Sequence, residues 1–357
     1  MQIAEIKNEL LEFEGKAPIS SLPMVSVIMP IRDEAKFIRK SLRAIIDQDY
    51  PAERFELIIA DGMSTDGTRD IVKQFIKENP DYSISLMNND KHIFPSGFNA
   101  ALKRAKGDIV IMLGGHTEIN RDYIRCCVEK LKNKEIDCVG GPIDTISNTL
   151  WGKAISRGMS SHFGVGGVRF RVGTQHPVEV DTVAFGAYRR SAIERCGWLD
   201  EELVRNQDDE YNYRLRKLGG KIFLCPDVRS TYYSRKSLTG LWRQYFQYGY
   251  WKVRVLQKHP KQMRWRQFVP PAFVAGLVGS ILLAPCFSWA RFLLILIAGF
   301  YIGANLLASV ITCFRNGLKH LPILPIVFAT LHLSYGSGFL VGLVRFANRW
   351  GNNSKRQ

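Results

Sequence analysis

Polar clusters that could bind a ligand or carry out catalysis follow several apolar runs of the chain. The clearest is Asp61-Gly-Met-Ser-Thr-Asp-Gly-Thr68, which combines carboxylates, hydroxyls and glycines. A carboxylate at a strand end, here Asp61, can accept hydrogen bonds from a nucleobase or a ribose, and glycine allows a close approach to the backbone. Ser64, Asp66 or Thr68 can equally cap a following helix, so an ordinary polar turn remains an alternative.

A second cluster, Pro30-Ile-Arg-Asp-Glu34, directly follows the first apolar run. Its backbone and carboxylates can also hydrogen-bond a nucleobase or a ribose. A capped helix start explains Asp33 equally well.

A third cluster, Gly114-Gly-His-Thr-Glu118, also follows an apolar run. A diphosphate-binding enzyme without a P-loop often places a metal ligand at such a turn, where the ion neutralises the departing diphosphate. His116 is the residue at the centre of this turn with the character of a ligand. A structural histidine is the alternative.

A fourth cluster, Asn206-Gln-Asp-Asp-Glu210, leads into a predicted helix. A carboxylate here can act as general base on a hydroxyl nucleophile, which contributes typically about 10²–10⁴-fold to a rate. Three carboxylates at a helix start also interact favourably with the helix dipole without any catalytic role.

A fifth cluster, residues 243–252, places aromatic, amide and cationic groups on one amphipathic helix. Such groups can stack on sugars and hold a diphosphate. They are equally typical of the belt of aromatic and basic residues at a membrane surface.

The elements that must position these clusters alternate along the chain. Apolar runs predict buried strands at 25–31, 55–61, 83–87 and 108–113, and helical spacing predicts helices at 34–46, 68–78 and 96–106. This order indicates βαβ units and a parallel sheet, which binds ligands at the carboxyl ends of its strands. Further on, we expect strands at 180–188 and 221–226, and a helix over 208–218 that ends at Gly219-Gly220. Helices 150–159 and 238–256 mix aromatic and basic residues, which favours interfacial helices over core helices.

The composition separates a mixed region from an apolar one. The net charge is +16, and residues 229–266 contain ten Lys or Arg and no Asp or Glu. This basic segment directly precedes the first long apolar run, which favours anionic lipid headgroups over nucleic acid as its partner.

Three apolar runs, 268–290, 292–314 and 321–344, contain no charged residue except His332 in the last. Each has about the 20 residues that a membrane-spanning helix needs. The basic loop 315–320 and the basic tail 345–357 both predict a cytoplasmic position. Three simple crossings would separate them, so Pro270-Pro271 and Pro285 suggest a re-entrant first run, and the number of crossings stays open.

The cysteines and the N-terminus suit a cytoplasmic catalytic region. Seven cysteines, an odd number, form no CxxC pair, which disfavours a disulfide framework or a zinc site. Residues 1–22 form an acidic extension without a long apolar core, so we expect no signal peptide.

Taken in order, the clusters resemble glycosyltransferase family 2 of inverting enzymes, and most closely its membrane-bound branch of the succinoglycan-biosynthesis type. The resemblance runs from about residue 25 to the end of the chain. It implies an α/β GT-A fold, the nucleotide-diphospho-sugar transferase fold, with a mostly parallel sheet flanked by helices and followed by interfacial and transmembrane helices. The implied domains are an extension at 1–22, a catalytic domain at 23–235 that includes an interfacial helix at 148–160, a basic interface region at 236–266, and a transmembrane region with a basic tail at 267–357.

The same resemblance assigns roles to individual residues. The catalytic carboxylate falls on Asp208, with Gln207 where the family usually has Glu, and the metal-binding position falls on His116. The donor-binding positions are Pro30, Ile31, Arg32, Glu34, Asp61, Ser64, Gly115, Arg243, Gln244 and Tyr248. The acceptor-side positions are Gly166, Gly167, Phe185, Gly186 and Asp209.

One departure from the family pattern affects the metal. Gly114 stands where the first carboxylate of the family's DxD element is expected, so His116 alone remains to bind a metal from this turn. The cofactor is a divalent ion, Mn²⁺ or Mg²⁺, and an imidazole ligand favours Mn²⁺.

The resemblance implies an enzyme of polysaccharide or glycan biosynthesis. It would transfer a sugar from a nucleotide donor, a UDP-sugar by default, to a lipid-linked polyprenyl saccharide at the cell membrane, with the catalytic domain in the cytoplasm. Direct transfer to polyprenyl phosphate is one alternative, and a non-catalytic nucleotide-sugar-binding membrane partner is another. The acidic cluster at 206–210 favours an enzyme over the binding partner.

Overall fold

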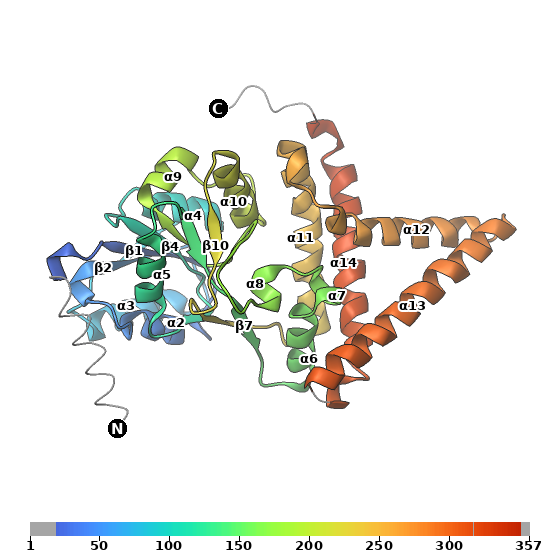
Figure 1. Cartoon of the computed structure of the whole chain (residues 1–357), viewed down its shortest axis with the longest axis horizontal. Helices are drawn as coiled ribbons and strands as arrows, with labels where there is room; N and C mark the ends of the chain where they lie inside the picture. The colour runs from blue at the N-terminus through green and yellow to red at the C-terminus, as the bar shows by residue number, and fades with distance from the viewer. Residues whose placement is uncertain (1–18, 317, 351–357) are drawn as a thin grey trace. The chain divides into compact units, whose positions relative to one another are not determined.

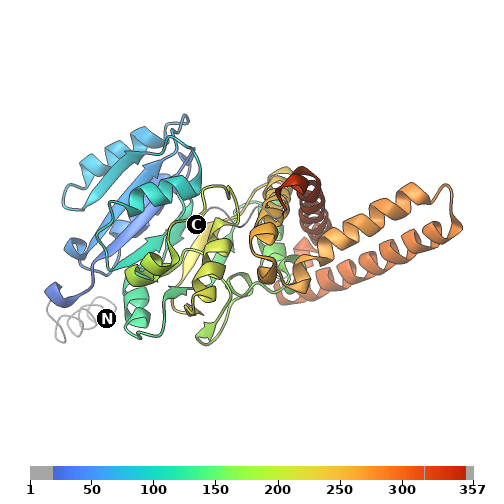
Figure 2. The same cartoon turned by 90° about the horizontal axis from the view of Figure 1, so that it is seen from above.

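The computed structural model describes residues 19–316 and 318–350 of the chain (Figures 1 and 2). These residues divide into two compact units. The first unit holds the described residues up to Gly141 together with 176–199 and 214–230. The second holds 142–175, 200–213 and the described residues from Thr231 onward. Most of the predicted extension 1–22 and the end of the basic tail lie outside the described residues.

An eight-stranded sheet organises the first unit. In spatial order its strands are β3 (Ile84–Asn88), β2 (Phe55–Asp61), β1 (Val25–Ile31), β4 (Ile109–Met112), β9 (Ala187–Arg189), β6 (Cys138–Gly140), β10 (Ile222–Leu224) and β8 (Val178–Glu179). The strands β3, β2, β1 and β4 run parallel, whereas β9 is antiparallel to β4 and β6. Every residue of β1 and β2 is buried, as expected for central parallel strands covered on both faces.

Helices of the first unit complete its core. They are α2 (Ile38–Ile46), α3 (Thr68–Glu78), α4 (Phe94–Leu102), α5 (Tyr123–Leu131) and α9 (Arg190–Cys196), with a short strand β5 (Thr117–Ile119) between β4 and α5. The apolar face of α2, formed by Ile38, Leu42 and Ile45, is fully buried in the cluster that also contains the strand residues. The predicted βαβ units and the mostly parallel sheet are therefore confirmed.

The strand order locates the point at which an open α/β sheet usually binds its ligand. The chain moves outward from β1 through β2 to β3 and then returns to place β4 on the other side of β1. The turns after β1 and β4 therefore flank the switch in strand order, where the crevice at the carboxyl ends of the strands forms. These turns contain Glu34 and His116.

The second unit is mainly helical. Its elements are β7 (Ile143–Ile146), α6 (Leu150–Met159), α7 (His162–Val165), α8 (Arg169–Val172), β11 (Ser230–Tyr233), α11 (Leu238–Lys258), α12 (Val269–Leu283), α13 (Ser288–Asn316) and α14 (Leu324–Arg345), together with the start of α10 (Gln207–Lys217). Figures 1 and 2 show α11 and α14 side by side, and α12 and α13 as a hairpin that extends away from them.

Most predicted elements lie where the sequence pattern indicates, and the strands at 25–31 and 55–61 and the helices at 68–78 and 150–159 have the predicted bounds. The helix predicted to begin at residue 34 begins instead at Ile38. Asp33 has a positive φ of 54°, and the amides of Glu34 and Ala35 bond to side chains of the neighbouring turn. The strand predicted over 180–188 is wrong for most of its length, because Phe185, with φ 54°, interrupts the extended backbone before β9 begins at Ala187.

Three C-terminal helices are long and apolar enough to span a membrane, over Trp265–Leu283, Ser288–Phe314 and Leu324–Arg345. Within the first apolar run, residues 269–283 form one continuous helix, α12, and the turn comes only after it. Pro270 and Pro271 lie in the first turn of α12, where proline is compatible with a helix, and Pro285 lies in the turn to α13. All seven cysteines are free thiols, and Cys286 in this turn is the one that is exposed.

Candidate active site

The turns after β1 and β2 are bonded to each other through side chains. The amide of Asp33 donates to Ser64 Oγ at 2.9 Å, and the amide of Glu34 donates to Thr68 Oγ1 at 2.7 Å. In return, the amide of Thr65 donates to Asp33 Oδ1 at 2.9 Å. Because these bonds run in both directions, the two turns form one rigid edge. The N-cap residue of α3 is Gly67, which makes no side-chain cap bond, so the polar cluster 61–68 has another role than an ordinary helix cap.

Asp61 is fully buried within this edge. Its Oδ1 accepts from Ser64 Oγ at 2.6 Å, and its Oδ2 pairs with Arg69 Nη1 at 2.9 Å. The other nitrogen of Arg69 donates to Asn88 Oδ1 at 2.7 Å. Asp61 thus orients Ser64 and Arg69, and the sequence pattern did not single out Arg69, although it stands directly after the Asp61–Thr68 cluster.

Glu34 and His116 meet at the switch in strand order. His116 Nδ1 lies 2.6 Å from Glu34 Oε1, and both side chains are partly exposed. Gly115 makes this approach possible, because a Cβ there would lie 2.8 Å from Glu34 Cγ and 3.0 Å from Ile31 Cγ2. The backbone of the turn is held by Ser41, whose hydroxyl donates to the Gly115 carbonyl at 2.9 Å.

The side chains around His116 suit a divalent ion that takes only part of its ligands from the protein. No group of three or more His, Cys, Asp or Glu side chains suited to a metal occurs among residues 19–316 and 318–350. In the tautomer with the proton on Nδ1, His116 donates to the Glu34 carboxylate and keeps its lone pair on Nε2. Histidine ligands in proteins are commonly oriented in this way by a carboxylate. His116, oriented by Glu34, can therefore serve as the single protein ligand of an ion that takes its remaining ligands from a diphosphate and water.

Gly114 has room for a side chain. A Cβ there would lie 3.6 Å from Thr117 Oγ1 and 3.8 Å from Phe185, which are ordinary contacts. Thr117 Oγ1 is itself buried and has no hydrogen-bond partner among the described residues. The carboxylate that the family pattern expects at this position is therefore absent for a reason other than space.

We expect Gly114→Asp to change the choice of metal. The added carboxylate gives the turn an oxygen ligand, which Mg²⁺ prefers, so the ratio of Mg²⁺-supported to Mn²⁺-supported turnover should rise. Gly114→Ala is the matched control, since it adds a Cβ without a ligand and should leave the ratio unchanged. Equal rates with both ions in the unmodified protein would contradict a role for His116 as a ligand.

In the second unit, the segment 200–210 is bonded to the C-terminal half of α11 and to the residues that follow it. Asn206 Nδ2 donates to the Tyr248 carbonyl at 2.9 Å, and Asp209 pairs with Lys252. Additional bonds join Arg254 to Glu202, Lys258 to Asp200 and Glu202, His259 to Glu210, and Gln262 to the Asp209 carbonyl. The position of Asp208 therefore depends on α11.

Asp208 itself is partly exposed in the first turn of α10. Burial raises the pKa of its carboxyl above the usual value, the neighbouring charge of Asp209 adds to the rise, and Lys252 opposes it. A carboxylate with a raised pKa is a stronger base than an ordinary aspartate, which suits the role predicted for Asp208.

The charges beside Asp208 predict opposite shifts in the pH profile. A base must be deprotonated, so turnover falls as the pH drops through the raised pKa. Asp209→Asn removes a negative charge and should move this acid limb to lower pH, whereas Lys252→Met removes a positive charge and should move it to higher pH. The measurement is kcat against pH for both variants. Shifts in the same direction would show that the acid limb does not report the ionisation of Asp208.

Two predicted donor-binding residues of α11 belong to an aromatic cluster in the second unit. Gln244 Nε2 donates to the hydroxyls of Tyr248 and Tyr232, at 2.9 and 3.3 Å. The Arg171 guanidinium lies 5.3 Å from the centre of the Tyr232 ring. Burial raises the pKa of Tyr248, which keeps its hydroxyl protonated. Arg243 lies next to this cluster in sequence and is exposed.

The predicted acceptor-side residues occur at special backbone positions in both units. Gly166 and Gly167 have positive φ angles of 65° and 73°. In the first unit, Phe185 has a positive φ, and its carbonyl accepts from the Tyr123 hydroxyl at 2.5 Å. A Cβ on Gly186 would lie 2.9 Å from Cys138 Sγ, so glycine is needed there for space.

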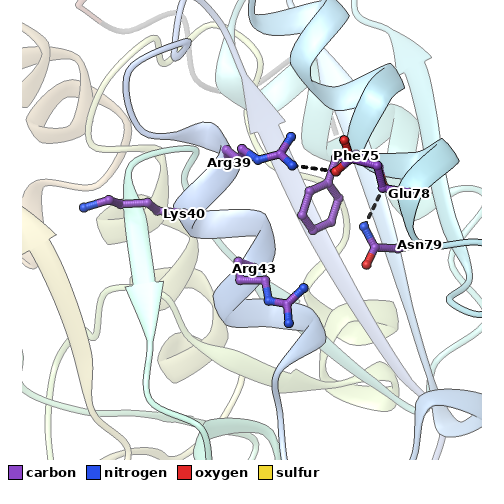
Figure 3. A pocket seen from close by; sticks show the side chains of 6 residues that line it. All are labelled: Arg39, Lys40, Arg43, Phe75, Glu78 and Asn79. Atoms are coloured by element: carbon purple, nitrogen blue, oxygen red, sulfur yellow. Dashed lines mark hydrogen bonds and ion pairs between the residues drawn. The ribbon is translucent and has the colours of Figure 1, made fainter.

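A separate hollow lies between α2 and α3 (Figure 3). It is lined by Arg39, Lys40, Arg43, Phe75, Glu78 and Asn79. Arg39 pairs with Glu78, and Arg43 pairs with Asp47. None of its lining residues belongs to the polar clusters, so this hollow is distinct from the candidate site.

Comparisons with known proteins identify the family and the fold of the chain. The family model "Glycosyl transferase family 2" matches residues 26–197. The dolichyl N-acetyl-alpha-D-glucosaminyl phosphate 3-beta-D-2,3-diacetamido-2,3-dideoxy-beta-D-glucuronosyltransferase of Methanococcus voltae is 30% identical over 327 residues, which are 90% of this chain and 97% of that protein. The succinoglycan biosynthesis protein ExoA of Rhizobium meliloti is 28% identical over 326 residues, which are 90% and 96% of the two chains.

A solved structure shares the fold. The mannosyltransferase PcManGT from Pyrobaculum calidifontis, in complex with GDP-Man and Mn²⁺, superposes with a TM-score of 0.62 at 19% identity and covers 93% of this chain and 92% of its own. The predicted GT-A architecture is thereby confirmed. The chain belongs to glycosyltransferase family 2, and it is a nucleotide-sugar glycosyltransferase of glycan or polysaccharide biosynthesis.

Proposed function

We propose that this enzyme inverts configuration while it transfers a sugar from a nucleoside-diphosphate sugar to a hydroxyl group of a polyprenyl-linked saccharide at the cytoplasmic face of the cell membrane. The observation that carries the proposal is the attachment of the segment 200–210 to α11. This helix packs in turn along the apolar helix α14, so the candidate base is bonded to the membrane region. A soluble acceptor would not require such a connection.

On the donor side, the proposal assigns the nucleotide to the rigid edge formed by the turns after β1 and β2. The turn 30–34 and Ser64 present backbone and hydroxyl groups there, held by the bonds between the two turns. The buried Asp61 stabilises this edge through its bonds to Ser64 and Arg69. Arg69 is a cation next to the proposed nucleotide site that the sequence pattern did not identify.

His116 would hold a divalent cation, and Glu34 would orient its ring. When bound, the cation supplies positive charge that stabilises the departing nucleoside diphosphate. The imidazole favours Mn²⁺, and the related structure from Pyrobaculum calidifontis contains this ion. Loss of the Glu34 carboxylate should therefore weaken Mn²⁺ binding without changing the fold, since the other contacts of the turn remain.

The proposed chemistry of the chain itself centres on Asp208. Its carboxylate accepts the proton of the acceptor hydroxyl while the hydroxyl oxygen bonds to the anomeric carbon. The bond from that carbon to the diphosphate oxygen breaks in the same step, which inverts configuration. Asp209, paired with Lys252, maintains the electrostatic environment of the base.

Two observations support a lipid-linked acceptor. The basic segment 229–266 carries ten Lys or Arg, a composition that attracts anionic headgroups. The relative from Methanococcus voltae is named for action on a dolichyl-linked sugar phosphate. The proposal extends this class of acceptor to the present chain.

The test is sugar transfer by the purified full-length protein. It would be incubated with Mn²⁺ and each common UDP- or GDP-sugar in turn, with a bacterial lipid extract as acceptor. We expect one radiolabelled sugar to enter the organic phase as a product longer than a monosaccharide, and mild acid to release an oligosaccharide. Release of a monosaccharide would instead indicate transfer directly to polyprenyl phosphate, and labelling of water-soluble glycans alone would contradict the proposal.

A further inference from the structure

The helix α14 differs from α12 and α13 in how it is covered. In its most apolar stretch, 50% of the residues are buried within the structure. The corresponding share is 11% for α13 and 17% for the span that contains α12. A helix of 22 residues is about 33 Å long, enough to cross the hydrocarbon region of a bilayer. Its contacts decide whether it does so.

Elements outside the three apolar helices contact α14 near its start, at its middle and at its end. His320, just before α14, bonds to Arg157 of α6. His332, at the middle, lies 2.9 Å from the carbonyl of Phe163 in α7. The carbonyl of Phe346, just after the helix, accepts from Gln257 of α11 at 2.8 Å. A spanning helix would carry one of these ends to the opposite face of the membrane.

The helix α11 lies directly against α14 and cannot lie in hydrocarbon. Its Lys252 and Arg254 pair with Asp209 and Glu202, and charged groups at the bilayer centre are costly. A Cβ on Gly342 of α14 would lie 2.7 Å from the Tyr250 carbonyl of α11, so the two backbones touch. The depth of α11 in the membrane is therefore also the depth of α14.

The hairpin of α12 and α13 has the opposite character. Both helices contact α14 at the base of the hairpin, where Tyr301 bonds to His332 and Asn305 donates to the Pro325 carbonyl. From this base they extend away from α14 toward the apex (Figure 2), and they expose large apolar side chains such as Leu282, Phe292 and Phe300. The uncharged stretch 292–314 is about 34 Å long as a helix, which matches a bilayer. Trp289 and Arg291 lie near the apex of the hairpin, where an aromatic and a basic residue would meet the far headgroups.

We propose that the membrane region crosses the bilayer twice, through α12 and α13, and that α14 lies in the plane of the headgroups on the side of the catalytic region. The chain then returns to the side from which it started, and the basic loop 315–320 and the basic tail share that side. This arrangement rests on the membrane location in the proposed function but does not depend on the reaction.

The test uses the exposed Cys286 at the apex of the hairpin, because the other six cysteines are buried. Sealed membrane vesicles of known orientation would be treated with a membrane-impermeant maleimide. Three full-length proteins are compared: the unmodified chain, Cys286→Ser with a cysteine appended after Gln357, and Cys286→Ser with Lys73→Cys on the exposed face of α3. Cys286→Ser alone is the control and should abolish labelling.

We expect the cysteine introduced at position 73 and the cysteine appended after Gln357 to react from the same face of the membrane. We expect Cys286 to react from the opposite face. An appended cysteine that reacts from the opposite face would indicate three crossings and overturn the proposal. A Cys286 that stays unreactive from both faces would place the apex within the bilayer and would also overturn it. Since labelling requires no turnover, these results are independent of the sugar-transfer assay.

Discussion

Replacement of Asp208 by Asn is expected to lower kcat by at least about 10²–10⁴-fold while the affinity for the nucleotide donor stays nearly unchanged. The amide has almost the same shape as the carboxylate but cannot accept the proton of the acceptor hydroxyl. In the proposed mechanism Asp208 contacts the acceptor hydroxyl and not the nucleotide. The affinity for the donor therefore has no reason to change. Initial rates of sugar transfer and calorimetric titration with the nucleotide in the presence of Mn²⁺ measure the two quantities.

The neighbouring carboxylate provides the matched control. Asp209 is paired with Lys252, so Asp209→Asn should keep measurable turnover at alkaline pH and differ mainly in its pH profile. Equal losses in the two variants would indicate disruption of the segment 200–210 rather than removal of a base. Full turnover in Asp208→Asn would assign the proton transfer to another group.

The parts of the fold that the sequence predicted well are those determined by local patterns. β1 and β2 are continuous apolar runs of seven residues, and their bounds agree with the prediction because burial on both faces requires an apolar residue at every position. The helix α6 was predicted from the spacing of its apolar stripe, and Thr149 caps it by accepting from the Gly152 amide. In each case the determining interaction lies within a few residues of the element.

The candidate site depends on contacts that no local pattern contains. Glu34 and His116 are 82 residues apart in the chain, and their contact follows from the placement of β4 beside β1. The family resemblance assigns Glu34 to donor binding and His116 to the metal, but it does not indicate the bond between the two side chains. The bond from Arg69 to Asp61 likewise cannot be predicted from the sequence, which shows only a basic residue in the first turn of a helix.

The error over 180–188 has a related cause. The alternation of Val180, Thr182 and Ala184 with other residues is typical of a strand, but an isolated segment gains strand geometry only from a partner. In the structure the extended backbone begins at Ala187, where β4 and β6 provide hydrogen bonds on both sides. Phe185, with its positive φ, ends the preceding loop.

The contact between α11 and α14 is the second place where a single substitution should have a large effect. A Cβ on Gly338 would clash with the carbonyl of Phe246, and one on Gly249 would clash with the carbonyl of Tyr335. Because both obstacles are backbone atoms, no side-chain movement can relieve them, and the helices must separate. We expect Gly338→Leu to cost at least about 3 kcal/mol of stability, at the upper end of the effects of overpacking.

A glycine of α13 provides the control. Apart from the backbone of its own helix, no atom of the described residues lies within 4 Å of a Cβ on Gly303, so Gly303→Leu should leave the melting temperature of the detergent-solubilised protein nearly unchanged. Gly338→Leu should lower it by several degrees and also lower kcat, because α11 holds Asn206 and Asp209 beside the proposed base. Equal melting temperatures for the two variants would show that α11 and α14 are not packed backbone to backbone, and the connection between the apolar helix α14 and Asp208 would then have no structural basis.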